Sequence, residues 1–278
     1  MNNGIRRSLR LGIARVLHAG TRLAGSEPTT PRILMYHRVR AASDNDPLCV
    51  EPGLFADQVA WLAEHAEIVR LGAITGKNSG PSRKCRVAIT FDDGYLDNLT
   101  EALPILVKHS APATLFVTSQ FCDQSLTHPR YQSERGQVHM TWDEVREWCS
   151  TDLLDIGSHS LTHAVLPLAD DETGKREIID SKKIIEDRAG FPAPYFAYPN
   201  GAYINRDVDF CREAGYIGAV TTHPGPVTAS RNNFELNRTE MNNKDWAEEL
   251  ELKIAGAFDL PHRILDWKRE RKLRALME

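Results

Sequence analysis

Two adjacent aspartates, Asp92 and Asp93, follow the apolar run 87–91 in the stretch VAITFDDGYLDN. Neighbouring carboxylates repel each other, so a buried strand gains no stability by ending in them. On extended backbone, adjacent side chains point in opposite directions, which makes it hard for both carboxylates to chelate one ion. The pair therefore predicts a division of labour, in which one carboxylate binds a metal ion and the other acts as general base for an attacking water.

Two histidines four residues apart, His159 and His163, lie in the stretch HSLTH. One helical turn would point both imidazoles to the same side, where they could share a metal ion. With one aspartate of the adjacent pair they form a His/His/Asp set, and three protein ligands with open positions suit a hydrolytic metal site. The alternatives are core or capping histidines, and aspartates that only cap a helix beginning near Asp97.

Short apolar, β-rich runs alternate along the chain with segments of helical periodicity. The predicted strands are 32–37, 67–71, 86–91, 113–118, 153–157, 194–199, 217–220 and 234–238. The predicted helices are 54–65, 97–109, 141–150, 171–189, 205–214 and 243–256, and Thr141 with Glu144 forms a capping box. This alternation predicts an α/β fold with parallel strands and right-handed crossovers, here an irregular (β/α) barrel of seven to eight parallel strands.

The unusual polar residues follow the predicted strands. They occur in YHRV (36–39), DDGY (92–95), SHSLTH (158–163), YPNGAY (198–203) and TTHPG (221–225). Active sites of α/β barrels are built from the loops at the carboxyl ends of the strands. We therefore expect these five segments to meet at one site.

Composition excludes some classes of partner. The 278 residues carry a net charge of −4, whereas a protein that binds nucleic acid usually has a basic surface. The five cysteines have no C-x-x-C spacing, so they favour a reducing compartment over a disulfide framework. No stretch approaches the ~20 apolar residues of a membrane-spanning helix. We expect a cytoplasmic protein.

The N-terminal segment 1–30 is basic and amphipathic. Apolar residues recur at steps of three and four between Ile5 and Leu17, and arginines stand between them, with Arg15 interrupting any secretory signal. Residues 5–23 could therefore contact an anionic membrane peripherally, and the alternatives are a helix packed on the domain or a frayed tail. We predict a catalytic domain over 31–242 and a C-terminal helical extension over 243–278.

With these residues assembled, the chain resembles the polysaccharide deacetylase family, the carbohydrate esterases with a NodB-homology domain. TFDDGY is similar to the family's first motif, HSLTH to its second and YPNG to its third, and the resemblance covers roughly 32–240. ILMYHRV and AVTTHPG are similar to the branch of exopolysaccharide and poly-N-acetylglucosamine deacetylases. The resemblance implies a NodB-type barrel that hydrolyses the N-acetyl group of an acetylated sugar or glycan, releasing acetate and a free amine.

The resemblance also implies roles for residues of the motifs. Asp92 is the implied catalytic base, and Asp93 the implied ligand, beside the two histidines of HSLTH, of one divalent metal ion. Zinc is favoured, with cobalt, nickel, manganese and iron as alternatives. The backbone N–H of Asn200 is the implied oxyanion donor. The implied substrate-binding residues are Tyr198, Pro199 and Gly201.

The sequence departs from the family in two places. Where the third motif carries an arginine that steadies the catalytic aspartate, this chain has Ala197. Arg238 is the favoured replacement, with Arg38 as the alternative. The usual late histidine general acid is not evident either, and relatives that begin with a Tyr-His strand use the histidine found here as His37. His223 is the competitor for that role.

Other readings stay open. Tyr36, Tyr95, Tyr198, Tyr203 and Trp142 could line a sugar-binding groove, although aromatics near strand ends are more often packing. The alternative functions are an amidohydrolase acting on a non-sugar amide and a non-catalytic glycan-binding protein. The intact metal ligands argue against the first, whereas the missing third-motif arginine leaves room for the second.

Overall fold

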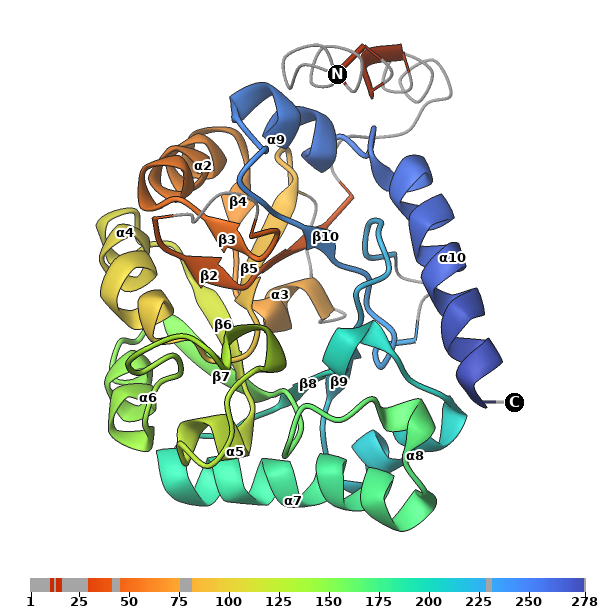
Figure 1. Cartoon of the computed structure of the whole chain (residues 1–278). Coiled ribbons are helices and arrows are strands. Elements are labelled where there is room, and N and C mark those ends of the chain that lie inside the picture. Colours follow the sequence, from red (N-terminus) through yellow and green to blue (C-terminus); the bar gives the residue numbers. More distant parts are fainter. Residues whose placement is uncertain are drawn as a thin grey trace.

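The computed structural model describes residues 11–12, 14–16, 30–41, 46–75, 82–228 and 232–277, and parallel strands form a curled sheet with helices around it (Figure 1). The strands are β1 (Arg32–Tyr36), β2 (Arg38–Val39), β3 (Cys49–Val50), β4 (Glu67–Ile68), β5 (Arg86–Phe91), β6 (Ala113–Val117), β7 (Leu154–Ser158), β8 (Tyr195–Ala197), β9 (Gly218–Val220) and β10 (Thr239–Glu240). The helices are α2 (Pro52–His65), α3 (Leu71–Thr75), α4 (Leu103–Lys108), α5 (Ser119–Cys122), α6 (Trp142–Cys149), α7 (Asp171–Ala189), α8 (Asn205–Glu213), α9 (Ala247–Ile254) and α10 (Asp259–Met277).

The main sheet has the strand order β10-β1-β5-β6-β7-β8-β9, with β4 beside β5, and its strand pairs are parallel. Leu236 bridges Val220 of β9, and three residues later Thr239 pairs with Leu34 of β1. One short segment therefore joins the two ends of the sheet. The predicted irregular (β/α) barrel of seven to eight parallel strands is confirmed.

Several predicted boundaries need correction. The last strand is not 234–238: this segment makes a bridge only at Leu236, and the paired strand is β10. The predicted helix 97–109 begins as a π-helix, η1 (Asn98–Ala102), before α4 continues it. The predicted helix 243–256 is the shorter α9, because its Ala255 C-cap is followed by Gly256 in the left-handed region (φ 85°), and α10 then follows. The capping box of Thr141 and Glu144 is confirmed.

Alternation along the strands separates the inside of the barrel from its outside. Leu34, Ile89 and Leu115 belong to a large core cluster that the outer helices cover. Their neighbours Ile33, Ala88 and Phe116 belong to a second cluster, which gathers side chains of β1, β5, β6, β8 and β9 with the short helix α3. Side chains of a strand alternate between its two faces, so this second cluster lies inside the barrel. Gly157 of β7 leaves room for it, because a Cβ there would lie 2.5 Å from the Phe116 ring.

The predicted terminal segments are described only in part. Of residues 1–30, Leu11 and Ala14 lie in helical turns that pack on Leu252, Ala257 and Phe258. Most of the predicted membrane-contacting segment 5–23 lies outside the described residues. Within the described part of the chain, no helix combines the length and the apolar character needed to cross a bilayer.

Candidate functional site

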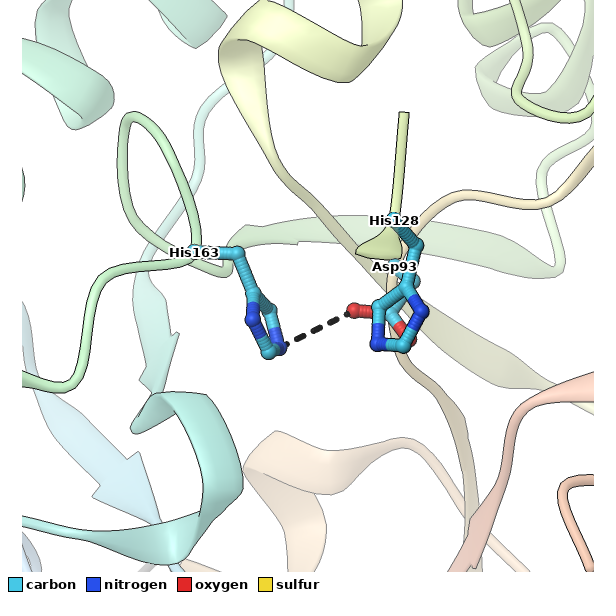
Figure 2. Close-up of side chains that lie close together, drawn as sticks. All are labelled: Asp93, His128 and His163. Carbon is cyan, nitrogen blue, oxygen red and sulfur yellow. Dashed lines mark ion pairs between the residues drawn. The ribbon is translucent and has the colours of Figure 1, made fainter. Parts of the chain in front are cut away.

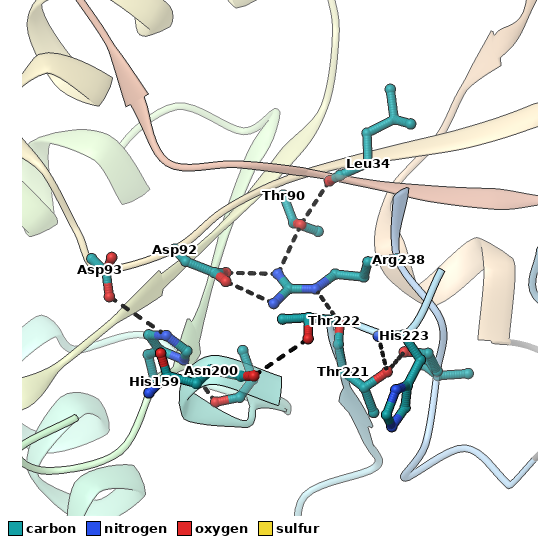
Figure 3. Close-up of polar contacts among 12 residues, drawn as sticks. Leu34, Thr90, Asp92, Asp93, His159, Asn200, Thr221, Thr222, His223 and Arg238 are labelled. Atoms are coloured by element: carbon teal, nitrogen blue, oxygen red, sulfur yellow. Dashed lines mark hydrogen bonds and ion pairs between the residues drawn. The ribbon is translucent and has the colours of Figure 1, made fainter. Parts of the chain in front are cut away.

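Strand β5 aims the two aspartates in different directions. Ala88 and Thr90 face the barrel interior, so alternation places Asp92 inside as well. Asp93 does not continue the strand: its φ is 69°, in the left-handed region, and Gly94 follows with φ 65°. The argument from extended backbone was therefore wrong for Asp93, although the two carboxylates do diverge (Figure 3). A positive φ in a residue other than glycine is strained and is often found at functional sites.

Asp92 is held by Arg238. The two carboxylate oxygens accept hydrogen bonds from Nη1 and Nη2 at 2.6 Å each, and both side chains are buried. The same guanidinium donates from Nε to the carbonyl of Thr221 at 2.8 Å and from Nη1 to Thr90 Oγ1 at 3.2 Å. Burial alone would raise the pKa of Asp92, but the charge and hydrogen bonds of Arg238, with help from nearby histidines, keep it below its ordinary value.

Arg38 occupies a different place. It pairs with Asp97 at 2.7 Å and with Glu134 at 2.9 Å, and it lies against the Tyr95 and Tyr131 rings. Of the two arginines proposed from the sequence, the structure therefore brings Arg238 to Asp92. The arginine reaches the aspartate from the segment that closes the barrel, and not from position 197 at the end of β8.

Asp93 faces two imidazoles. Its Oδ1 lies 3.5 Å from His159 Nε2 and 3.4 Å from His163 Nε2. The Asp93 side chain is buried, and Oδ1 has no hydrogen-bond partner among the described residues. A buried carboxylate oxygen without a donor is costly, unless a cation that the protein binds satisfies it.

The hydrogen bond that His159 Nδ1 makes leaves the Nε2 atom of the ring facing Asp93. His159 Nδ1 lies 2.7 Å from the carbonyl oxygen of Ala197, which can only accept a hydrogen bond. Nδ1 therefore carries a proton, and in the neutral form of the ring Nε2 keeps the lone pair that a metal ion needs. Ala197, which replaces the arginine of the third motif, thus supports the histidine through its backbone.

His163 reaches the site from a non-helical loop that follows β7. Residues 159–163 are not helical, so the predicted helical turn of HSLTH is wrong. His163 has φ 64°, its N–H donates to Ser160 Oγ at 2.9 Å, and buried Glu177 accepts hydrogen bonds from the backbone of Leu161 and Thr162. These polar contacts replace helical ones and still point both rings at Asp93.

A further histidine, His128, was missed by the sequence analysis. Asp93, His128 and His163 each offer a ligand atom within 4.8 Å of the others (Figure 2). Nδ1 of His128 accepts a hydrogen bond from the backbone N–H of Arg130 at 3.2 Å, so the neutral ring carries its proton on Nε2. His128 and His159 are therefore opposite tautomers, and only His159 presents its Nε2 lone pair. The available signal was position, since His128 lies in the long connection after β6, at the same carboxyl face.

These residues fit a divalent metal ion. The observation that tests the fit is the buried Asp93 Oδ1, which has no donor within the described ranges and has two imidazoles beside it. Burial lowers the pKa of His163 to about 4 although Asp93 opposes this shift, so the ring is neutral near pH 7, as metal ligation requires. One carboxylate and two imidazoles are a donor set that zinc accepts.

The third-motif segment 198–201 borders the site. Asn200 is exposed and has φ 56°, and its carbonyl accepts a hydrogen bond from Thr222 Oγ1. Gly201 has φ 69°, and a Cβ there would lie 2.1 Å from Thr222 Oγ1, so this position requires glycine. Pro199 is buried.

The aromatic side chains correct one sequence prediction. The Tyr198 ring is fully buried and its hydroxyl donates to the carbonyl of Phe234 at 3.1 Å, so the ring does not fit the predicted substrate contact. Tyr36, Tyr95 and Trp142 are buried packing residues too. Of the five aromatics, only Tyr203 is partly exposed and lines a cavity.

The two candidate general acids lie in different surroundings. His37 is close enough to the aspartates for its charge to contribute to the lowered pKa of both Asp92 and Asp93. His223 lies on the other side of Arg238 from Asp93 (Figure 3), and its Nδ1 is 2.5 Å from Asp266 Oδ2 of α10. Of the two histidines, His37 is therefore the one whose charge acts on both aspartates.

Comparison with known proteins points to one family. The sequence profile described as polysaccharide deacetylase matches residues 79–219, just over half of the chain. The Bacillus subtilis (strain 168) protein YxkH, provisionally named a polysaccharide deacetylase, is 28% identical over 219 residues, 77% of this chain and 72% of that protein. The Escherichia coli (strain K12) poly-beta-1,6-N-acetyl-D-glucosamine N-deacetylase is 28% identical over 137 residues, 46% of this chain but 20% of that protein. The Streptococcus pyogenes deacetylase PplD, solved in complex with acetate, superposes with a TM-score of 0.72 at 25% identity, covering 82% of this chain and 99% of that one.

Proposed function

The chain belongs to the polysaccharide deacetylase family, and from that premise we propose that it hydrolyses the N-acetyl group of an acetylated glycan with the help of one divalent metal ion. The observation that carries the proposal is the unequal aspartate pair. Asp92 is ionised and paired with Arg238, whereas Asp93 Oδ1 is buried, has no donor in the part of the chain that the structure describes, and faces the two histidines. The names of the relatives support a glycan substrate.

Asp93, His159 and His163 would hold the ion. When bound, it would act as a Lewis acid that polarises the acetamide carbonyl. Zinc is the favoured ion for this donor set, and cobalt, nickel, manganese and iron remain alternatives.

The other residues move protons and stabilise charge. Asp92 takes a proton from the attacking water, since its carboxylate is ionised near neutral pH. Water oxygen adds to the acetamide carbon, and the backbone N–H of Asn200 is proposed to stabilise the oxyanion. The carbon–nitrogen bond then breaks, the amine leaves with a proton from His37, and acetate is the second product.

Acetate release tests the proposal. The zinc-loaded protein should release acetate from oligomers of N-acetylglucosamine, lose this activity on treatment with a chelator and regain it when zinc is added back. The measurement is an enzymatic acetate assay with a parallel assay for free amine. Release that resists exhaustive metal removal would contradict the metal dependence. Tight glycan binding without release in any divalent metal would favour the non-catalytic alternative, and release only from a non-sugar amide would favour the amidohydrolase.

The ring tautomers of His159 and His128 predict that His159, and not His128, binds the ion. His159→Ala should raise the dissociation constant of zinc by at least about 10–100-fold, the cost of losing even an outer hydrogen bond of a metal ligand. His128→Ala should leave the constant unchanged, because Nδ1 of that ring accepts the Arg130 N–H and Nε2 is protonated. Competition with a chromophoric chelator measures both constants. An equal loss in the two variants would make His128 a ligand.

Membrane contact through residues 5–23 remains a proposal from the sequence. Arg15 pairs with Glu248 and Val16 is exposed, while Leu11 and Ala14 pack on the C-terminal helices. These contacts also suit the alternative of a helix packed on the domain.

A further inference from the structure

His139 lies between the connection that follows β6 and the start of α6, outside the family motifs, and its side chain is 1% exposed. We propose that His139 is a positioning residue, whose ring fixes the backbone of Asp93 on one edge and the backbone of His128 on the other. The inference rests on the proposed function, in which Asp93 is a metal ligand. It adds the residue that sets the direction from which this ligand reaches the ion.

The two ring nitrogens of His139 have different partners. Nδ1 lies 2.9 Å from the carbonyl oxygen of Asp93, which can only accept a hydrogen bond. The backbone N–H of His128 donates to Nε2 at 3.1 Å. Nδ1 therefore carries the proton of the ring and Nε2 its lone pair, so both contacts require the same neutral tautomer. One buried ring thus joins the backbone of a proposed metal ligand to that of a neighbouring histidine.

The hydrogen bond from His139 is made at the turn that presents the Asp93 side chain. The N–H of Asp92 still donates to the carbonyl of Tyr36 at 3.0 Å, as the end of β5, whereas Asp93 and Gly94 have φ values of 69° and 65°. A left-handed φ is unfavourable for a residue other than glycine and persists where the surrounding contacts hold it. Loss of the bond to the Asp93 carbonyl would free the peptide group that joins Asp93 to Gly94, and the carboxylate would lose its direction.

His139 is itself held by its backbone and by the faces of its ring. An antiparallel bridge pairs its backbone with that of Tyr95, just beyond the turn. Its carbonyl accepts hydrogen bonds from Gln124 Nε2 at 3.2 Å and from Gln137 Nε2 at 3.0 Å. The imidazole stacks on Phe121 and on Tyr95, with ring centroids 4.3 and 4.9 Å apart. A ring fixed in this way can impose its own position on the two segments that it joins.

Three substitutions separate the hydrogen bonds of the ring from its packing. His139→Phe keeps a flat ring and removes both bonds. His139→Asn keeps an amide donor at the position of Nδ1, whereas His139→Gln keeps an amide acceptor near the position of Nε2. Competition with a chromophoric chelator should show that the dissociation constant of zinc rises about 10–100-fold in His139→Phe and in His139→Gln. His139→Asn should recover most of this loss, because it restores the donor to the Asp93 carbonyl.

The pair of amide variants is the matched control for stability. Both lose the stacked ring, so a role in stability alone would weaken zinc binding equally in His139→Asn and His139→Gln. The free energies of unfolding of the metal-free variants, measured on the same preparations, should not follow the order of the zinc constants. Equal zinc constants in the two amide variants would overturn the inference, and so would a native constant in His139→Phe.

Crystal structures of the metal-free variants supply a readout that needs neither zinc nor activity. Asp93 should keep its left-handed φ in His139→Asn and leave that region in His139→Gln and in His139→Phe. If His139→Phe does not fold, the two amide variants still decide the question. An unchanged Asp93 backbone in His139→Gln would contradict the positioning role. The predicted change at Asp93, found together with a native protein that binds no zinc, would support the positioning role and overturn the proposed function alone.

Discussion

Replacing Asp92 by asparagine should lower the rate of acetate release by about 10²–10⁴-fold and leave the affinity for zinc unchanged. The loss has the size expected for a general base, because asparagine cannot accept the proton of the attacking water. We expect zinc still to bind because Asp92 is paired with Arg238 and is not one of the three proposed ligands. The measurements are kcat/KM for acetate release and zinc titration on the same preparation.

Asp97→Asn is the matched control for this variant. Asp97 also pairs with a buried arginine, Arg38, but it does not face the histidines. The control should therefore lose stability without a comparable loss of rate. A rate in Asp92→Asn within tenfold of the native rate would contradict the assignment of the base, and so would a loss of bound zinc.

Replacing Arg238 by methionine should produce the largest change in stability. Breaking a buried ion pair by removing one partner costs about 3–5 kcal/mol, since the other charge stays buried without compensation. The double variant Asp92→Asn/Arg238→Met should recover part of this loss, because it removes the buried charge as well. Chemical unfolding of the metal-free proteins measures the free energies of unfolding.

The same substitution should change the pH dependence. Burial raises the pKa of Asp92 and Arg238 opposes it, so removal of the cation should raise that pKa by about 1–3 units. The base works when deprotonated, so the acidic limb of the kcat/KM profile should move to higher pH. The stability deficit of Arg238→Met should shrink as pH falls through the raised pKa, because protonation then removes the buried charge.

Arg38→Met controls for a general effect of losing a buried arginine. Its partners are Asp97 and Glu134, so it should destabilise the protein without moving the acidic limb. A shift of the limb in Arg38→Met equal to that in Arg238→Met would contradict the proposed role of Arg238.

The sequence was sufficient to predict the barrel, because strands such as β1 and β6 are continuously buried and the helices between them have clear periodicity. The adjacent aspartates and the two histidines were predictable as a group because they follow strands whose carboxyl ends share one face. The backbone conformation of these residues could not be predicted from the sequence. Asp93, His163 and Asn200 all have positive φ, a conformation set by tertiary contacts rather than by local propensity.

Long-range partners were the least predictable part of the site. Arg238 was one of two candidates, and only the closure of the barrel brings it across 146 residues to Asp92. His128 carries no motif and reaches the site from an irregular connection. The burial of the Tyr198 ring could not be predicted either, because an aromatic residue at a strand end can face either the core or the solvent.

The central claim is that Asp93 binds the metal ion and Asp92 does not. Its most direct test is an anomalous-difference map of zinc-loaded crystals of this protein, recorded at the zinc absorption edge. The account predicts one peak bonded to Asp93, His159 and His163, with Asp92 still paired to Arg238. A peak bonded to Asp92, or a peak bonded to His128 in place of His159, would contradict it.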